Sequence, residues 1–214
     1  MPQLRPHICP HTARPRLAAV PVLLCLVLAL WAGSGQAAAT QAVSARAGFP
    51  DLPLNLAPAS ASALGLGSGG PTSLARIPAE GLLVVLVSYF CPPCHIEVPR
   101  LKDLERRIRE RGLAGRIRLV GLAVGDDQAQ VERFLARHGG LPFPLLPDPA
   151  LAAHKRLGNP VVPTLYAVAS HGGGLRLLSL HQGEFTEDPD LFLDTLLRAL
   201  PAPPGAAPAA RQKK

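Results

Sequence analysis

Two cysteines three residues apart, Cys91 and Cys94, lie where one apolar pattern gives way to another. Residues 82–87, just before them, are an unbroken apolar run rich in β-branched side chains, which predicts a buried strand. After them, apolar residues recur at helical spacing from Val98 to Ile108, which predicts an amphipathic helix. The free amides and partial positive charge of a helix N-terminus favour a thiolate over a thiol. We therefore expect Cys91 at an exposed tip and Cys94, one turn later, to be more covered.

Residues 1–39 have the composition of a secretory signal. Two arginines precede an apolar run over residues 17–32, and small residues suitable for signal peptidase follow it. The run is short for a membrane span and contains Pro21, so we expect cleavage, with an uncleaved membrane anchor as the alternative. In both cases the rest of the chain is exported, and we expect a periplasmic protein.

Export changes what the cysteines can do. The chain has 4 cysteines, and Cys9 and Cys25 both fall in the leader. The exported part keeps only Cys91 and Cys94, which are too close in sequence to staple distant segments together. This indicates that the pair itself is the working part of the protein.

The net charge of +7 gives little information about partners. Three arginines of the leader and three basic residues at the C-terminus account for six of these charges, so the body of the chain carries +1. We therefore expect no nucleic-acid partner.

The 214 residues divide into four predicted segments. After the leader, residues 40–75 are rich in Ala, Ser, Gly and Pro, which predicts a linker with one short edge strand near residues 49–54. A folded domain is expected over residues 76–200, and residues 201–214 form a Pro/Ala tail with a basic end, expected to be disordered.

Within the domain, strand and helix patterns alternate. Strands are predicted over residues 82–89, 116–124, 143–146, 164–169 and 175–180, with helices over residues 95–111, after the capping candidates Asp126 and Asp127, over 150–157, and from Pro189 onward. This order predicts an α/β fold with a parallel core sheet and an antiparallel edge.

The motif Cys91-Pro92-Pro93-Cys94 stands at the strand-to-helix turn, Glu97 and Pro99 follow Cys94 by three and five residues, and Val162-Pro163-Thr164 precedes a β-hairpin. In these four features residues 48–200 resemble the thioredoxin-like proteins, and among them the TlpA/ResA-type periplasmic thiol–disulfide oxidoreductases. The resemblance implies a thioredoxin-like fold, a mixed central sheet with helices on both faces. The chain departs from the family at Phe90, where a Trp is usual, and its turn before Cys91 is shorter.

The resemblance also implies roles for individual residues. Cys91 would attack a substrate disulfide and Cys94 would resolve the mixed disulfide, while Glu97 would relay a proton. Pro163 would be a cis-proline that holds the backbone of the preceding residue toward the substrate. The residues implied in substrate binding are Phe90, Pro92, Pro93, Val162 and Thr164.

The expected activity is disulfide exchange with partner proteins, with reduction favoured over oxidation. The expected partners are exported thiol or disulfide proteins, such as apocytochromes, and a membrane or periplasmic electron donor. We expect a monomer that needs no cofactor and no metal.

Three other classes compete with this interpretation. The residues Cys91 to His95 also spell the c-type haem attachment pattern, although the one Met lies in the leader and leaves no Met ligand. A peroxiredoxin-like antioxidant would carry a lone peroxidatic cysteine. A thiol metallochaperone would need only accessible thiolates, but no second set of ligands is visible. His95 itself is expected either to tune Cys91 or to face water.

Overall fold

The computed structural model describes residues 48–201. The predicted leader, the predicted anchor and the predicted disordered tail beyond residue 201 lie outside these residues. Among residues 48–201, no helix has both the length and the apolar character needed to cross a membrane.

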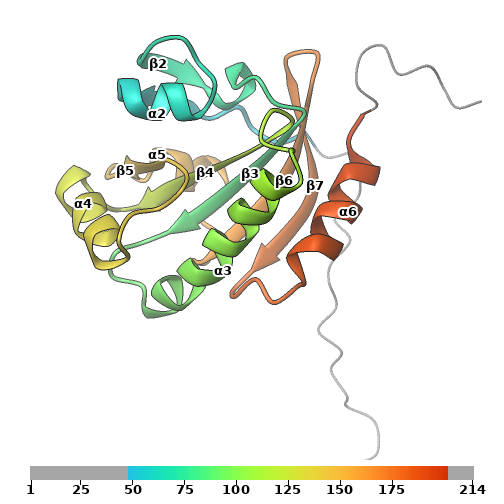
Figure 1. Cartoon of the computed structure of the whole chain (residues 1–214). Helices are drawn as coiled ribbons and strands as arrows, with labels where there is room; N and C mark the ends of the chain where they lie inside the picture. Colours follow the sequence, from blue (N-terminus) through green and yellow to red (C-terminus); the bar gives the residue numbers. More distant parts are fainter. Residues whose placement is uncertain (1–47, 202–214) are drawn as a thin grey trace, which may run out of the picture. The chain divides into compact units, whose positions relative to one another are not determined.

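A five-stranded mixed sheet forms the centre of the domain (Figure 1). Its order is β5-β4-β3-β6-β7, in which β3 is parallel to β4 and antiparallel to β6. The strands are β3 (Gly81–Val87), β4 (Ile117–Val124), β5 (Leu145–Asp148), β6 (Thr164–His171) and β7 (Gly174–Gln182). Every residue of β3 is buried, as its unbroken apolar run predicts. The predicted α/β fold is confirmed, with a parallel core and an antiparallel edge.

Helices cover both faces of this sheet. On one face α3 (Pro92–Glu110) and α6 (Pro189–Ala199) lie side by side, and α4 (Gln128–Arg137) adds Val131 and Phe134 to the same apolar core. On the other face α5 (Ala152–Arg156) contributes Ala153 to a second core.

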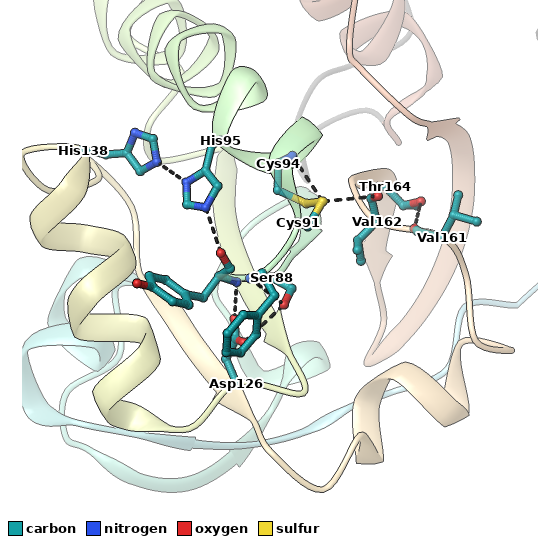
Figure 2. Close-up of a disulfide and its surroundings, with 11 residues drawn as sticks. Ser88, Cys91, Cys94, His95, Asp126, His138, Val161, Val162 and Thr164 are labelled. Carbon is teal, nitrogen blue, oxygen red and sulfur yellow. Dashed lines mark hydrogen bonds between the residues drawn. A yellow bond between two sulfur atoms is a disulfide. The ribbon is translucent and has the colours of Figure 1, made fainter.

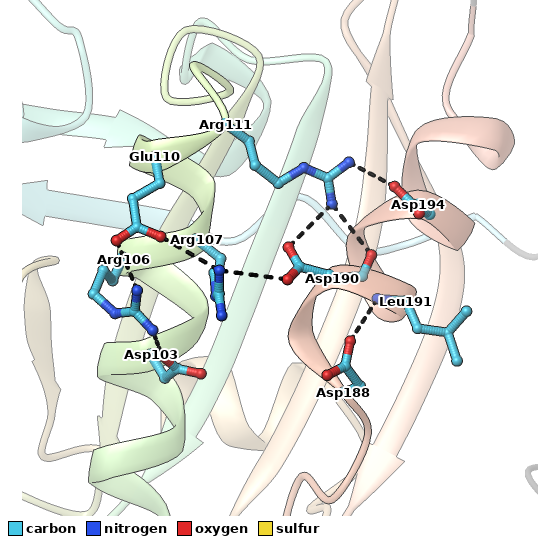
Figure 3. Close-up of polar contacts among 9 residues, drawn as sticks. All are labelled: Asp103, Arg106, Arg107, Glu110, Arg111, Asp188, Asp190, Leu191 and Asp194. Carbon is cyan, nitrogen blue, oxygen red and sulfur yellow. Dashed lines mark hydrogen bonds and ion pairs between the residues drawn. The ribbon is translucent and has the colours of Figure 1, made fainter.

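Charged side chains join α3 to α6 at the surface (Figure 3). Arg111 pairs with Asp194 at 2.5 Å and with Asp190 at 3.5 Å, and Arg107 lies 3.6 Å from Asp190. These side chains are between 29% and 50% exposed, so each pair stabilises the domain by at most about 1 kcal/mol. The pairs fix how α6 lies along α3, while the apolar side chains beneath supply most of the stability.

Residues 48–75, predicted as a linker, are part of the folded domain. They form a two-stranded antiparallel sheet of β1 (Pro53–Leu56) and β2 (Gly70–Ser73), with α2 (Pro58–Ala63) between them and the 3-10 helix η1 (Leu74–Arg76) after them. Leu52, Leu64 and Leu74 are fully buried in the core on the second face of the central sheet. The expected linker is therefore folded over residues 48–75, because a few well-spaced leucines suffice for this burial. The short edge strand expected near residues 49–54 corresponds in part to β1.

This finding predicts that Leu52→Ala lowers the free energy of unfolding by about 3 kcal/mol, since it leaves a cavity at a fully buried site. Urea denaturation followed by far-UV circular dichroism measures the change. Leu191→Ala is the matched control, because Leu191 is 62% exposed and should cost less than about 0.5 kcal/mol. Equal effects of the two substitutions would contradict the assignment of residues 48–75 to the core.

The strand ends bring distant segments together beside the cysteines. Val87 at the end of β3 is the partner of Ala123 in β4, and Leu86 is the partner of Thr164 at the start of β6. The turn that leads to Cys91 therefore lies between the β4–α4 loop and the loop before β6. Such an edge, where parallel strands end, is the usual place for a site in an α/β sheet.

Candidate active site

Cys91 and Cys94 form a disulfide at the N-terminus of α3 (Figure 2). The helix begins at Pro92, three residues earlier than predicted, and Cys91 is its N-cap. The amide of Cys94 donates a hydrogen bond to Cys91 Sγ at 3.2 Å. Since the two intervening prolines have no N–H, this is the first amide of the helix that can donate to the sulfur.

The two sulfurs differ in access. Cys91 is half-buried, whereas Cys94 is fully buried against the core beneath α3. A partner protein can therefore reach Cys91 and not Cys94. This asymmetry fits the predicted order in which Cys91 attacks and Cys94 resolves.

The loop before β6 lies opposite Cys91. The Val162–Pro163 peptide bond is cis, as the resemblance implied, and the carbonyl oxygen of Val162 lies 3.5 Å from Cys91 Sγ. Thr164 is fully buried and its hydroxyl donates to the carbonyl oxygen of Val161 at 2.6 Å. Thr164 therefore supports the loop from inside and its side chain does not face a substrate, which corrects the prediction for this residue.

Glu97 lies one helical turn after Cys94 and is only 2% exposed. Both carboxylate oxygens accept from the amide of Phe185 at 3.1 Å, and Arg100 Nη1 lies 3.9 Å away. Burial raises the pKa of Glu97 to about 7, although the Phe185 amide and Arg100 act in the opposite direction. A carboxyl group with this pKa can both accept and release a proton at neutral pH.

Exposed apolar side chains border the disulfide. Phe90 is 69% exposed, Ile96 58% and Val161 61%, and each lies next to the cysteine motif or the cis-proline loop in the sequence. Pro92 and Pro93 are exposed as well. These side chains give the chain on either side of Cys91, and just before the cis-proline, an exposed apolar border, and Phe90, Pro92 and Pro93 were among the predicted substrate-binding residues.

Two residues of this region have contacts that were not predicted. Asp126 was expected to help cap the next helix, but Asp127 alone caps α4, through a capping box with Gln130. Asp126 is instead buried and its carboxylate accepts from Ser88 Oγ and from the amide of Tyr89. His138, the C-cap of α4, lies 2.7 Å from His95 between ring nitrogens.

The surroundings of Cys94 and His95 do not suit haem attachment. Cys94 is fully buried, so its sulfur is not open to a vinyl group, and both ring nitrogens of His95 have hydrogen-bond partners. Within residues 48–201, no group of three or more His, Cys, Asp or Glu side chains is arranged to hold a metal ion.

The sheet order, the cysteine pair at the start of α3 and the cis-proline beside it define a protein with the thioredoxin-like fold. The family model described as Redoxin matches residues 55–192, and the chain belongs to this family.

Comparison with individual proteins agrees with this assignment. The chain is 26% identical over 119 residues to the thiol-disulfide oxidoreductase ResA of Halalkalibacterium halodurans, a match that covers 56% of this chain and 63% of that protein. A structure assigned as a thiol:disulfide interchange protein DsbE from Chlorobium tepidum has a TM-score of 0.53 at 18% identity, covering 72% of this chain and 96% of that one. A secreted thiol-disulfide isomerase from Corynebacterium glutamicum has a TM-score of 0.51 at 20% identity, covering 71% and 84%. These two structures share the fold.

Proposed function

We propose that this protein is an exported thiol–disulfide oxidoreductase that exchanges disulfides with partner proteins and works as a reductase. The observation that carries the proposal is the asymmetric pair at the start of α3, in which a reachable Cys91 is bonded to a buried Cys94. The similarity to ResA and the membership of the Redoxin family support the same activity.

The exchange proceeds in two balanced steps from the reduced protein. The Cys91 thiolate attacks one sulfur of a partner disulfide, and the other partner sulfur leaves as a thiolate that takes a proton from water. Cys94 then loses its proton and attacks Cys91 Sγ, which releases the first partner sulfur. Two electrons pass to the partner, which becomes a dithiol, and the Cys91–Cys94 disulfide forms. A second dithiol protein restores the reduced pair by the reverse sequence.

Glu97 is the proposed acceptor for the proton of Cys94. It lies three residues further along α3, on the same side of the helix, and it is buried in the same core region as Cys94. Its raised pKa of about 7 leaves it partly ionised at neutral pH, so it can take a proton from the thiol as the thiol attacks.

The two prolines favour the reducing direction. Each amide that donates to the Cys91 thiolate stabilises the reduced form, and a strongly stabilised reduced form makes a pair oxidising. Pro92 and Pro93 occupy the first two helical positions and donate nothing, so the thiolate has fewer amide donors than an ordinary helix start would give it. The reduced form is then less favoured, and the pair gives up its electrons more readily.

Partners and location belong to the same proposal. The exposed apolar border at Phe90 and Val161, and the backbone carbonyl of Val162 facing Cys91, suit an extended segment of an exported thiol or disulfide protein. A secretory leader over residues 1–39 would deliver the domain to the periplasm, either free or anchored. There the protein would act as a monomer, and a membrane or periplasmic electron donor would reduce its cysteine pair.

Two turnover assays test the direction. Reduction of insulin disulfides by dithiothreitol, followed by turbidity, should be accelerated strongly by the purified protein. Oxidation of reduced, unfolded ribonuclease A by the disulfide form should be at least about tenfold slower than with a strongly oxidising pair near −120 mV. Rapid oxidation of ribonuclease A without acceleration of insulin reduction would reverse the proposed direction.

A further inference from the structure

A hydrogen-bonded pair of histidines lies beside the cysteine motif (Figure 2). His95 Nδ1 is 2.7 Å from His138 Nε2, and His95 Nε2 is 2.8 Å from the carbonyl oxygen of Tyr89. The two imidazole rings lie edge to edge with centroids 5.0 Å apart and planes inclined by 25°, and His95 stacks on Phe134 at 4.9 Å. These contacts join the first turns of α3 to the last turn of α4.

The hydrogen-bond acceptors around the two histidines determine which ring nitrogens carry protons. A backbone carbonyl only accepts, so His95 Nε2 must carry a proton and donate it to Tyr89. One further proton lies between His95 Nδ1 and His138 Nε2, so the pair is either neutral or carries a single positive charge. Burial, His95, Arg137 and Lys102 all lower the pKa of His138, which disfavours a positive charge on that ring.

In the turn between β3 and Cys91, side chains form hydrogen bonds with both the backbone amide and the backbone carbonyl of Tyr89. The amide of Tyr89 donates to the Asp126 carboxylate at 2.6 Å, and its carbonyl accepts from His95. Ser88 Oγ donates to the same carboxylate at 3.2 Å. The two anchors come from different elements, since Asp126 lies in the β4–α4 loop and His95 in α3.

Two hydrogen bonds lie within the turn, from the Cys91 amide to the Ser88 carbonyl oxygen at 3.2 Å and from the Phe90 amide to Ser88 Oγ at 3.4 Å. The side chains of Asp126 and His95 are what tie this short turn to the neighbouring elements. Residues 88–90 are the whole connection from β3 to the N-cap cysteine, and the Phe90 side chain is 69% exposed. Lys102 Nζ donates to the carbonyl oxygen of His138 at 2.5 Å, so the far end of the pair is itself fixed to α3.

We propose that His95 and His138 are positioning residues for disulfide exchange: they hold the Tyr89 carbonyl through a chain of hydrogen bonds and so fix the Cys91 sulfur for attack. This inference rests on the proposed exchange activity. It assigns the pair a geometric role, and the role requires a donor at the place of each Nε2.

Matched substitutions separate the hydrogen bonds from the packing. His95→Phe keeps an aromatic ring but cannot bond Tyr89, whereas His95→Gln carries an amide donor close to the place of Nε2. His138→Leu and His138→Gln form the second pair in the same way. His181→Phe is the control, because His181 is a similarly covered histidine packed on Phe185 and Phe192 away from this turn.

The measurement is the second-order rate constant for reaction of the reduced full chain with 5,5′-dithiobis(2-nitrobenzoate), with urea midpoints recorded for each variant. All proteins in the series carry Cys9→Ser and Cys25→Ser, so that only the Cys91–Cys94 pair can react. His95→Phe should react about tenfold more slowly and His138→Leu about threefold more slowly, as expected for loss of one hydrogen bond. Both Gln variants should recover most of the wild-type rate, and His181→Phe should retain it.

Slow reaction of both Gln variants, or wild-type rates in both His95→Phe and His138→Leu, would overturn the proposal. If His95→Phe does not fold, the two His138 variants decide the question alone. Failure of the exchange activity is recognised separately, because the wild-type protein itself would then not accelerate the reduction of insulin.

Discussion

Replacing Cys91 with serine is expected to abolish disulfide exchange, lowering the rate of insulin reduction about 1,000-fold or more, to the uncatalysed level. Cys91 is the sulfur that a partner can reach, and Cys94 is fully buried behind it. A serine hydroxyl at the N-cap preserves the local hydrogen bonding but cannot attack a disulfide. The insulin turbidity assay measures the loss.

Cys94→Ser is the matched variant, because it removes one sulfur atom from the same turn but leaves the attacking thiol. It should form a mixed disulfide with a partner and fail to release it, so a covalent complex accumulates and is visible on non-reducing gels. If Cys91→Ser traps the complex and Cys94→Ser does not, the roles of the two cysteines are reversed.

The second large effect is expected for Glu97→Gln, which should raise the free energy of unfolding at pH 8 by up to about 3 kcal/mol. The folded protein raises the pKa of Glu97 from 4.5 to about 7, so between these values the folded state binds more protons than the unfolded state. The wild-type protein therefore loses stability as pH rises from about 4.5 to 7. Gln cannot ionise, so the difference in the free energy of unfolding between Glu97→Gln and the wild type should vanish below about pH 4.5 and be full above pH 7. Urea denaturation at several pH values measures this difference.

Glu105 provides the control for this prediction. It lies on the same helix, and burial likewise raises its pKa to about 7. Glu105→Gln should thus give a similar gain of stability with an unchanged rate of exchange. Glu97→Gln should in addition slow the release of mixed disulfides about tenfold or more at pH 7, because the Cys94 proton loses its acceptor. Equal exchange rates in the two variants would rule out a proton-transfer role for Glu97.

Local patterns in the sequence were enough to predict the elements that carry the cysteines. The run of residues 82–87 is apolar at every position, as expected for a strand that is buried on both faces, and the spacing from Val98 to Ile108 matches a helix. The cis bond before Pro163 followed from the resemblance alone, since a proline at a strand entrance is compatible with either isomer.

The parts that could not be predicted depend on long-range contacts. Leu52 and Leu74 lie in a segment with little apolar periodicity. Their burial depends on the second face of a sheet whose strands come later in the sequence. His95 and His138 are 43 residues apart and Asp126 is 37 residues from Tyr89. No local pattern indicates that these side chains meet, because only the sheet order brings their loops to one edge.

The most direct test of the proposed activity is the reduction potential of the Cys91–Cys94 pair. The purified protein is equilibrated in dithiothreitol or glutathione buffers, and the free thiols are then labelled and counted by mass. We predict a reversible two-electron couple at about −250 mV or lower, in the range of reducing thioredoxin-like pairs. A potential near −120 mV would make the protein an oxidant, and the absence of a reversible couple would contradict the oxidoreductase assignment itself.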